Sequence, residues 1–209
     1  AYSNLINFWN WVKYFPNVLA DETDEILKND FDQNKFKNLQ WFLRSGEVRR
    51  DNLLATAAAF FAVNRASFSG STLSGGYSPN HPRFNQRSID KIRTFGMENF
   101  HSLKCYDFEE ALSINPDCFA YCDPPYLLEK KKNNLYGNQG DLHKNFDHER
   151  LRKILAERKN WILSYNDCEA IREMYKKHKI ISLDWKYGLG YNKKSSEILI
   201  FSKDYVPNQ

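Results

Sequence analysis

The stretch from Cys118 to Tyr126 constrains the fold more than any other part of the chain. Its apolar run, residues 119–122, is typical of a buried parallel strand. This strand must end at the two prolines that follow Asp123, because proline donates no hydrogen bond to a sheet and its ring fixes φ. Ligands of open α/β sheets bind at the carboxyl ends of the strands. We therefore expect Asp123 and Tyr126 to lie over such an edge.

The groups in this turn, Asp123-Pro124-Pro125-Tyr126, suit a planar exocyclic amine. Asp123 can accept one N–H, the Pro124 carbonyl can accept the other, and Tyr126 can stack on the attached ring. The carboxylate would also offset positive charge that grows on the nitrogen as it receives a methyl group. The simpler interpretation is a proline-terminated strand whose acid caps a loop, and the four residues alone do not decide between the two.

Composition adds modest limits. The 209 residues predict one domain, or one domain with a sizeable insertion, and the net charge of +4 permits an anionic partner without requiring one. No apolar run is long enough for a membrane helix and no secretory signal is visible, so we expect a cytoplasmic protein. The cysteines lack the paired spacing of a zinc site, which predicts reduced thiols and no metal. They are Cys105, Cys118, Cys122 and Cys168.

The order of predicted elements is that of an α/β protein. Helical spacing predicts helices that begin near Leu5, Leu53, Asp90, Asp147 and Ile171, with helical pieces in residues 21–50. Strands are expected at residues 100–105, 118–122, 161–167, 179–183 and 196–202. Residues 69–87 are rich in serine, glycine, proline and asparagine and predict a loop or hairpin.

Three segments together resemble the Dam-type N6-adenine DNA methyltransferases, which use S-adenosyl-L-methionine. They are Asp123–Tyr126, Asn64–Gly70 and Leu163–Asp167, in the order that this family has. The resemblance implies an α/β fold, a Rossmann-like methyltransferase sheet with helices on both faces and a small inserted DNA-recognition region. It implies methyltransferase core in residues 1–20 and 96–209, with a helical target-recognition insertion in residues 21–95. Double-stranded DNA is the expected partner, and a restriction endonuclease would be a second one.

The resemblance also implies roles for single residues. Catalysis falls to Asp123, Pro124, Pro125 and Tyr126, while Asp107, Phe108 and Asp123 would bind the cofactor. The alternative for Asp107 is an N-cap of the helix that follows it, and the two roles can coexist.

DNA binding is expected of Arg65, Phe68 and Ser69, where Phe68 would fill the gap that a flipped base leaves. Ser69 stands where the family usually has asparagine. The other interpretation of Phe68 is a core residue at a helix end. Lys130, Lys131 and Lys132 could contact phosphates, or they belong to an ordinary solvated loop.

Two parts of the family pattern precede the first residue of this chain: the acid that binds the cofactor ribose and the Phe-x-Gly-x-Gly loop. Neither Gly75-Gly76 nor the glycines of residues 188–190 opens a helix, so neither replaces that loop. We expect a fragment of a longer protein. The alternatives are a catalytically incomplete DNA-binding subunit of the same fold and, less favoured, a methyltransferase acting on a glutamine amide or an RNA base.

Overall fold

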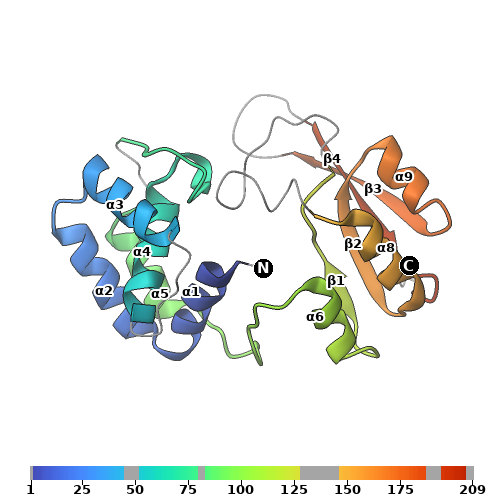
Figure 1. The fold of residues 1–209 in the computed structure, drawn as a ribbon, viewed down its shortest axis with the longest axis horizontal. Helices are drawn as coiled ribbons and strands as arrows, with labels where there is room; N and C mark the ends of the chain where they lie inside the picture. The colour runs from blue at the N-terminus through green and yellow to red at the C-terminus, as the bar shows by residue number, and fades with distance from the viewer. Residues whose placement is uncertain (1, 45–51, 80–82, 128–145, 187–193, 206–209) are drawn as a thin grey trace. The chain divides into compact units, whose positions relative to one another are not determined.

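The computed structural model describes residues 2–44, 52–79, 83–127, 146–186 and 194–205, and Figure 1 shows its elements. These residues form two compact units. The first, here called the helical unit, comprises the described residues up to 105, and the second, the sheet unit, comprises those from 106 onward. Among the described residues, no helix has the length and hydropathy needed to cross a membrane.

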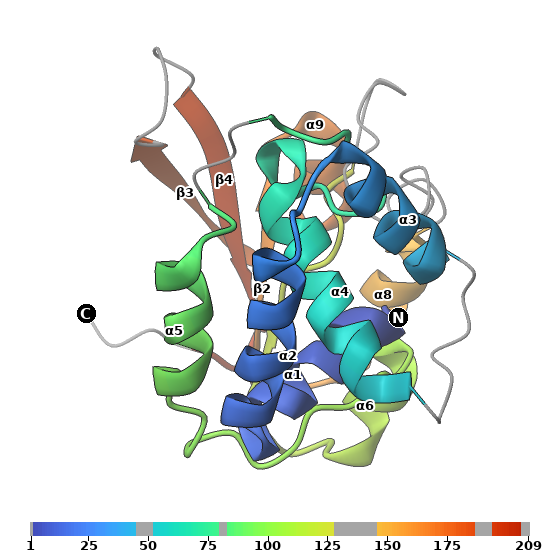
Figure 2. The ribbon, with the colours of Figure 1, turned by 90° about the vertical axis from the view of Figure 1, so that its left-hand side faces the viewer.

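The helical unit is built around one central helix. Its elements are α1 (Ser3–Tyr14), α2 (Pro16–Lys28), α3 (Gln33–Arg44), α4 (Leu53–Ala66), the 3-10 turn η2 (Phe68–Gly70) and α5 (Gln86–Thr94). Helix α4 is alanine-rich and buried over most of its length, with α1, α2 and α3 packed against it (Figures 1 and 2). Alanine side chains let neighbouring helices approach closely, and rings such as Phe8 and Phe61 fill the space that remains.

The sheet unit has a four-stranded mixed sheet. Its elements are α6 (Phe108–Ile114), β1 (Ala120–Cys122), α8 (His148–Glu157), β2 (Trp161–Asn166), α9 (Glu169–Met174), β3 (Lys179–Lys186) and β4 (Lys194–Phe201). The strand order is β1-β2-β4-β3, where β1 pairs with β2 in parallel and the other pairs are antiparallel. The expected α/β class and the parallel strand before the prolines are therefore confirmed.

The described core of the sheet unit lies on one face of the sheet. Trp161, Leu163 and Tyr165 alternate along β2 toward this face, where they pack with α8 and α9. The indole N–H of Trp161 donates to the Leu155 carbonyl of α8 at 2.8 Å, and its ring contacts Tyr175, just after α9, edge-on. Residues between them, such as Ser164, point to the opposite face.

Two expectations about strands are wrong. The strand at residues 118–122 is not buried: β1 pairs only with β2 among the described strands, and Tyr121 is 61% exposed. Residues 100–105 form no strand and no described segment pairs with them, so their backbone is held otherwise: Lys13 donates to the carbonyls of Phe100 and His101.

Candidate active site and nucleic-acid interface

The turn Asp123–Tyr126 lies at the carboxyl end of the parallel strand pair, as the sequence predicts. Cys122 is in register with Leu163, so the next residue on each strand, Asp123 and Ser164, lie beside one another. The Ser164 hydroxyl donates to Asp123 Oδ1 at 2.9 Å. Asp123 is exposed whereas Ser164 is buried, so an exposed carboxylate is fixed from the sheet side.

Tyr121 extends this contact. It lies two residues before Asp123 on β1, on the same sheet face, and its hydroxyl donates to Ser164 Oγ at 3.1 Å. Ser164 is also 3.4 Å from the Cys122 carbonyl, a longer and weaker contact. The result is a chain of hydrogen bonds from Tyr121 through Ser164 to Asp123.

Tyr126 is held by β4 and β2. Its hydroxyl donates to Glu197 Oε1 at 2.9 Å, and its half-buried ring contacts that of Tyr165, with centroids 6.4 Å apart. Burial raises the pKa of Tyr165, whose hydroxyl lies 2.7 Å from His148 Nδ1. The residue after Tyr126 is fixed as well, because Asn166 Nδ2 donates to the Leu127 carbonyl at 3.1 Å.

Asp107 and Phe108 form a second polar cluster, at the start of α6. Asp107 Oδ1 accepts from the Glu109 N–H at 3.0 Å, so the expected N-cap is confirmed. Arg150 of α8 also contacts Asp107 Oδ1, pairs with Glu109 at 3.2 Å and lies over the Phe108 ring, 4.3 Å from its centroid. The Glu109 N–H, followed by the Arg150 guanidinium, holds the pKa of Asp107 below its usual value.

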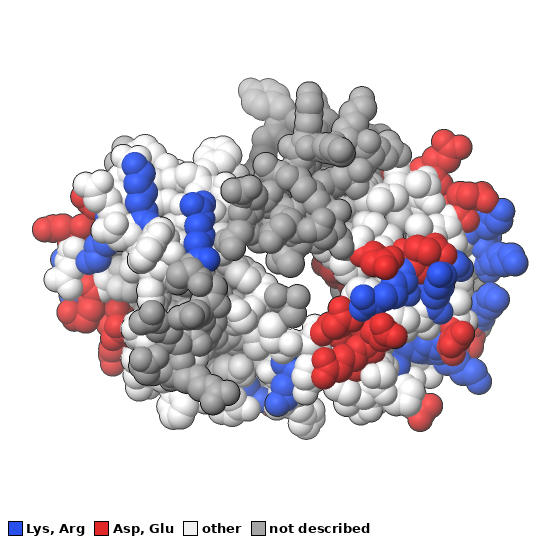
Figure 3. Space-filling model, viewed as in Figure 1, with Lys and Arg blue, Asp and Glu red and all other residues white. Residues whose placement is uncertain are grey.

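The surface around these residues carries charges of both signs. Figure 3 shows acidic and basic side chains side by side over the sheet unit. Several are ion pairs within one helix or across its end, including Arg152 with Glu149 and Arg172 with Asp167, both at 2.5 Å. Exposed pairs of this kind contribute little stability and neutralise one another locally. Lys130, Lys131 and Lys132 lie outside the described residues.

In the helical unit, the end of α4 presents an aromatic ring to solvent. Phe68 is 70% exposed, which overturns the core interpretation of this residue. The turn beneath it is left-handed, with φ of 54° at Ser69 and 72° at Gly70. Asparagine and glycine adopt this conformation most readily, which gives a physical reason for the family's usual asparagine where this chain has Ser69.

Two side-chain amides, one half-buried and one buried, hold this turn in place. Asn64 Nδ2 donates to the Gly70 carbonyl at 3.0 Å and to Thr72 Oγ1 at 2.9 Å. Gln40 of α3 donates to the carbonyls of Thr72 and Gly75 at 2.7 and 2.8 Å. The turn that carries Phe68 is therefore fixed by α3 and α4 rather than by its own short hydrogen bonds alone.

Two arginines lie beside the same turn. Arg83 donates to the Ser67 carbonyl at 2.6 Å. Arg65 stacks on Phe61 at 5.3 Å, and its buried Nε has no hydrogen-bond partner among the described residues. Burial, together with the nearby charge of Arg83, lowers the pKa of Arg65. A partly buried arginine beside a second, exposed arginine forms a place that favours an anion.

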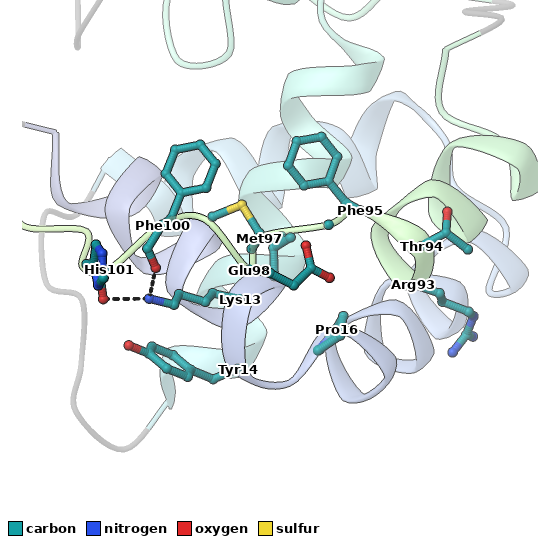
Figure 4. Close-up of a pocket in the computed structure, with 12 residues that line it drawn as sticks. Lys13, Tyr14, Pro16, Arg93, Thr94, Phe95, Met97, Glu98, Phe100 and His101 are labelled. Carbon is teal, nitrogen blue, oxygen red and sulfur yellow. Dashed lines mark hydrogen bonds between the residues drawn. The ribbon is translucent and has the colours of Figure 1, made fainter.

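The helical unit also has an open groove of about 500 Å³ between the end of α1, the start of α2 and the segment after α5. Figure 4 shows Phe95 and Phe100 along one side, with Tyr14 and Pro16 on the other. The Lys13 ammonium, 2.6 Å from the His101 carbonyl, is used to hold the chain there. None of the predicted site residues that the structure describes lines this groove.

Sequence reasoning missed several of these contacts. Ser164 lies inside the segment that resembles the family, but nothing in the sequence shows that it reaches Asp123. Parallel pairing of the two strands, with Asp123 and Ser164 at corresponding ends, was the available signal. Arg150 and Gln40 carry no motif, and their roles follow only from the packing of α8 on α6 and of α3 beside the turn.

Polar groups at the carboxyl edge of parallel strands are the usual site of chemistry in an α/β protein, so fold and site first define an α/β enzyme. The family model of D12 class N6 adenine-specific DNA methyltransferases matches residues 3–189, and the chain belongs to this family. No curated protein matches the chain. The activity of this family is methylation of adenine N6 in DNA, as the resemblance of the three segments implied.

Proposed function

We propose that this protein transfers the methyl group of S-adenosyl-L-methionine to adenine N6 in double-stranded DNA, and that the turn after β1 receives the adenine. The observation that carries the proposal is the exposed Asp123 carboxylate, with one oxygen fixed by Ser164 at 2.9 Å. Its other oxygen accepts one N6–H, and the Pro124 carbonyl accepts the second. Pro125 stiffens the turn, and the ring of Tyr126 stacks on the purine.

Asp123 acts mainly as an acceptor and an electrostatic stabiliser. Two acceptors on the amino group let the nitrogen become pyramidal, so that its lone pair points toward the methyl donor. Positive charge grows on N6 in the transition state, and a fixed carboxylate stabilises it without reorganising. Alignment of the nitrogen with the methyl group supplies much of the rate.

The residues at the start of α6 fit the adenine end of the cofactor. Both described contacts of Asp107 go to Oδ1, which leaves Oδ2 to accept from an adenine amine. Phe108 offers a half-buried ring for packing, and Asp123 lies at the methyl-donor end. S-adenosyl-L-methionine supplies the methyl group; these residues bind and orient it.

DNA binding falls to the end of α4 and the loop after it. Phe68 is an exposed ring on a fixed turn and fills the space left by the flipped base. Arg65 and Arg83 contact phosphate, and Ser69 lies at the same surface. Lys130–Lys132 add sequence-independent phosphate contacts.

The described sheet is proposed to be part of a larger methyltransferase sheet. The outer edge of β1 is where further strands of a Rossmann-like sheet would pair, with helices on the second face. Residues 1–20 and 96–209 then serve as methyltransferase core, with residues 21–95 as the target-recognition insertion. A restriction endonuclease that cuts the unmethylated sequence would be the matching partner.

The test is methyl transfer from tritiated S-adenosyl-L-methionine to unmethylated plasmid DNA, with N6-methyladenine identified by mass spectrometry after digestion to nucleosides. Asp123→Ala should abolish transfer while duplex binding stays within a few-fold. Activity of Asp123→Ala close to that of the parent protein would disprove the role of this carboxylate. If the protein without substitutions binds DNA but transfers no methyl group, a catalytically incomplete subunit would be favoured.

A further inference from the structure

We infer that Ser164, backed by Tyr121, is the positioning residue that sets the orientation of the Asp123 carboxylate for catalysis. The inference rests on the proposed function and deepens it, since it assigns residues that act through Asp123 rather than on the substrate. Both residues lie in segments that the sequence singles out, but only the hydrogen bonds of the folded chain link them to Asp123 and carry the assignment.

An exposed carboxylate can turn freely unless a neighbouring group holds it. The torsion that turns the two oxygens of an aspartate is broad and nearly two-fold, so an unrestrained Asp123 would present either oxygen in many orientations. Ser164 removes this freedom by donating to Oδ1 at 2.9 Å. A hydrogen bond to an ionised acceptor is stronger than a neutral one, and Oδ2 then faces outward as the acceptor for N6.

The hydrogen-bond donor, Ser164, is itself held rigidly. Ser164 is 4% exposed and lies on β2, which pairs with β1 on one side and β4 on the other. Its backbone therefore cannot follow motions of the turn after β1. The carboxylate is tied to the middle of the sheet rather than to its own loop.

The hydroxyl of Ser164 has a single proton to donate. Ser164 Oγ can donate to only one acceptor, Asp123 Oδ1 at 2.9 Å or the Cys122 carbonyl at 3.4 Å. The Tyr121 hydroxyl donates to Ser164 Oγ at 3.1 Å, so Ser164 Oγ accepts one hydrogen bond and donates one. Polarisation along such a chain strengthens the bond to the carboxylate.

The experiment compares variants in methyl transfer to unmethylated plasmid DNA, with kcat and KM measured separately for DNA and S-adenosyl-L-methionine. Ser164→Ala should lower kcat by about 10- to 100-fold with both KM values within about 3-fold, because misplacing a reacting group by about 1 Å can cost 100-fold. Ser164→Thr keeps the hydroxyl and should restore kcat to within about 5-fold. Tyr121→Phe, at an exposed position, should lower kcat by about 3- to 10-fold.

Matched controls remove equivalent groups elsewhere in the sheet unit. Ser182→Ala loses an exposed hydroxyl on β3 that accepts from Arg172 at 2.7 Å, and Tyr205→Phe loses a phenol a few residues after the end of β4. Both should keep kcat within about 2-fold. The midpoint of urea-induced unfolding, measured for every variant, separates loss of the fold from loss of the orientation of Asp123.

The outcomes are distinct. If kcat of Ser164→Ala and of Tyr121→Phe stays within 2-fold while Asp123→Ala is inactive, the inference is overturned and the proposed function stands. If Asp123→Ala itself is active, the proposed function fails. A loss in Ser164→Ala that appears mainly as raised KM, without rescue by threonine, would overturn the inference in favour of a structural role.

Discussion

Gln40→Ala should destabilise the helical unit out of proportion to the size of the change. Gln40 is 7% exposed, and its amide donates to the carbonyls of Thr72 and Gly75 at 2.7 and 2.8 Å. Each such bond contributes about 1–1.5 kcal/mol net, and alanine leaves both carbonyls without this donor. We expect a loss of about 2–3 kcal/mol in the free energy of unfolding.

Urea denaturation followed by tryptophan fluorescence measures this loss. With a slope of about 1.5–2 kcal/mol per M, the midpoint should fall by about 1–2 M. Gln33→Ala is the matched control, because Gln33 is an exposed glutamine on the same helix, and its midpoint should hardly change. A shift below about 0.3 M for Gln40→Ala would refute the view that α3 holds the turn beneath Phe68.

Three further predictions test other parts of the molecule. Phe68→Ala should change the free energy of unfolding by less than about 0.5 kcal/mol, since the ring is 70% exposed. It should weaken base flipping about 5- to 100-fold, measured by the fluorescence of 2-aminopurine at the target position. Unchanged fluorescence would contradict the proposal that Phe68 fills the gap left by the flipped base. Gly70→Ala should cost about 1–2 kcal/mol in urea denaturation, because φ is +72° and the new Cβ would lie 3.3 Å from Arg83, whereas Gly76→Ala meets nothing and should be nearly neutral. Burial lowers the pKa of His178, so the unfolded chain binds more protons than the folded one, and the free energy of unfolding should fall as pH drops through about 6.5. His178→Gln should flatten this fall between about pH 7.5 and 5. An unchanged slope of unfolding free energy against pH would contradict the prediction.

Local chemistry made the position of the candidate site at the sheet edge predictable. The prolines after Asp123 require a strand to end there, and Asp107 carries the side chain and position of an N-cap, so both features follow from the order of residues. Exposure did not follow, because an apolar run reads alike in a central strand and at an edge. Tyr121 is exposed since β1 pairs on one side only among the described strands, which no run of four residues reveals.

The environment of each site residue depended on packing between distant segments. Ser164 is 41 residues from Asp123 in the chain, and Arg150 is 43 from Asp107. Such pairings need the register of two strands, or the docking of α8 on α6, and neither is encoded by local spacing. The alternatives for Phe68 were equally matched in the sequence because an aromatic residue at a helix end suits both core and surface. Only the folded chain, in which the ring is 70% exposed, shows that Phe68 faces solvent.

The contact of Arg150 with one oxygen of Asp107 bears on how the two proposed ligands should respond to ionic strength. Arg150 contacts Oδ1, and the proposed function assigns Oδ2 to the exocyclic amine of the cofactor adenine, which is uncharged. DNA held through phosphate contacts is instead released as the salt concentration rises. Under the proposed function, a titration with sodium chloride should therefore loosen the polynucleotide while leaving the affinity for the nucleoside nearly unchanged.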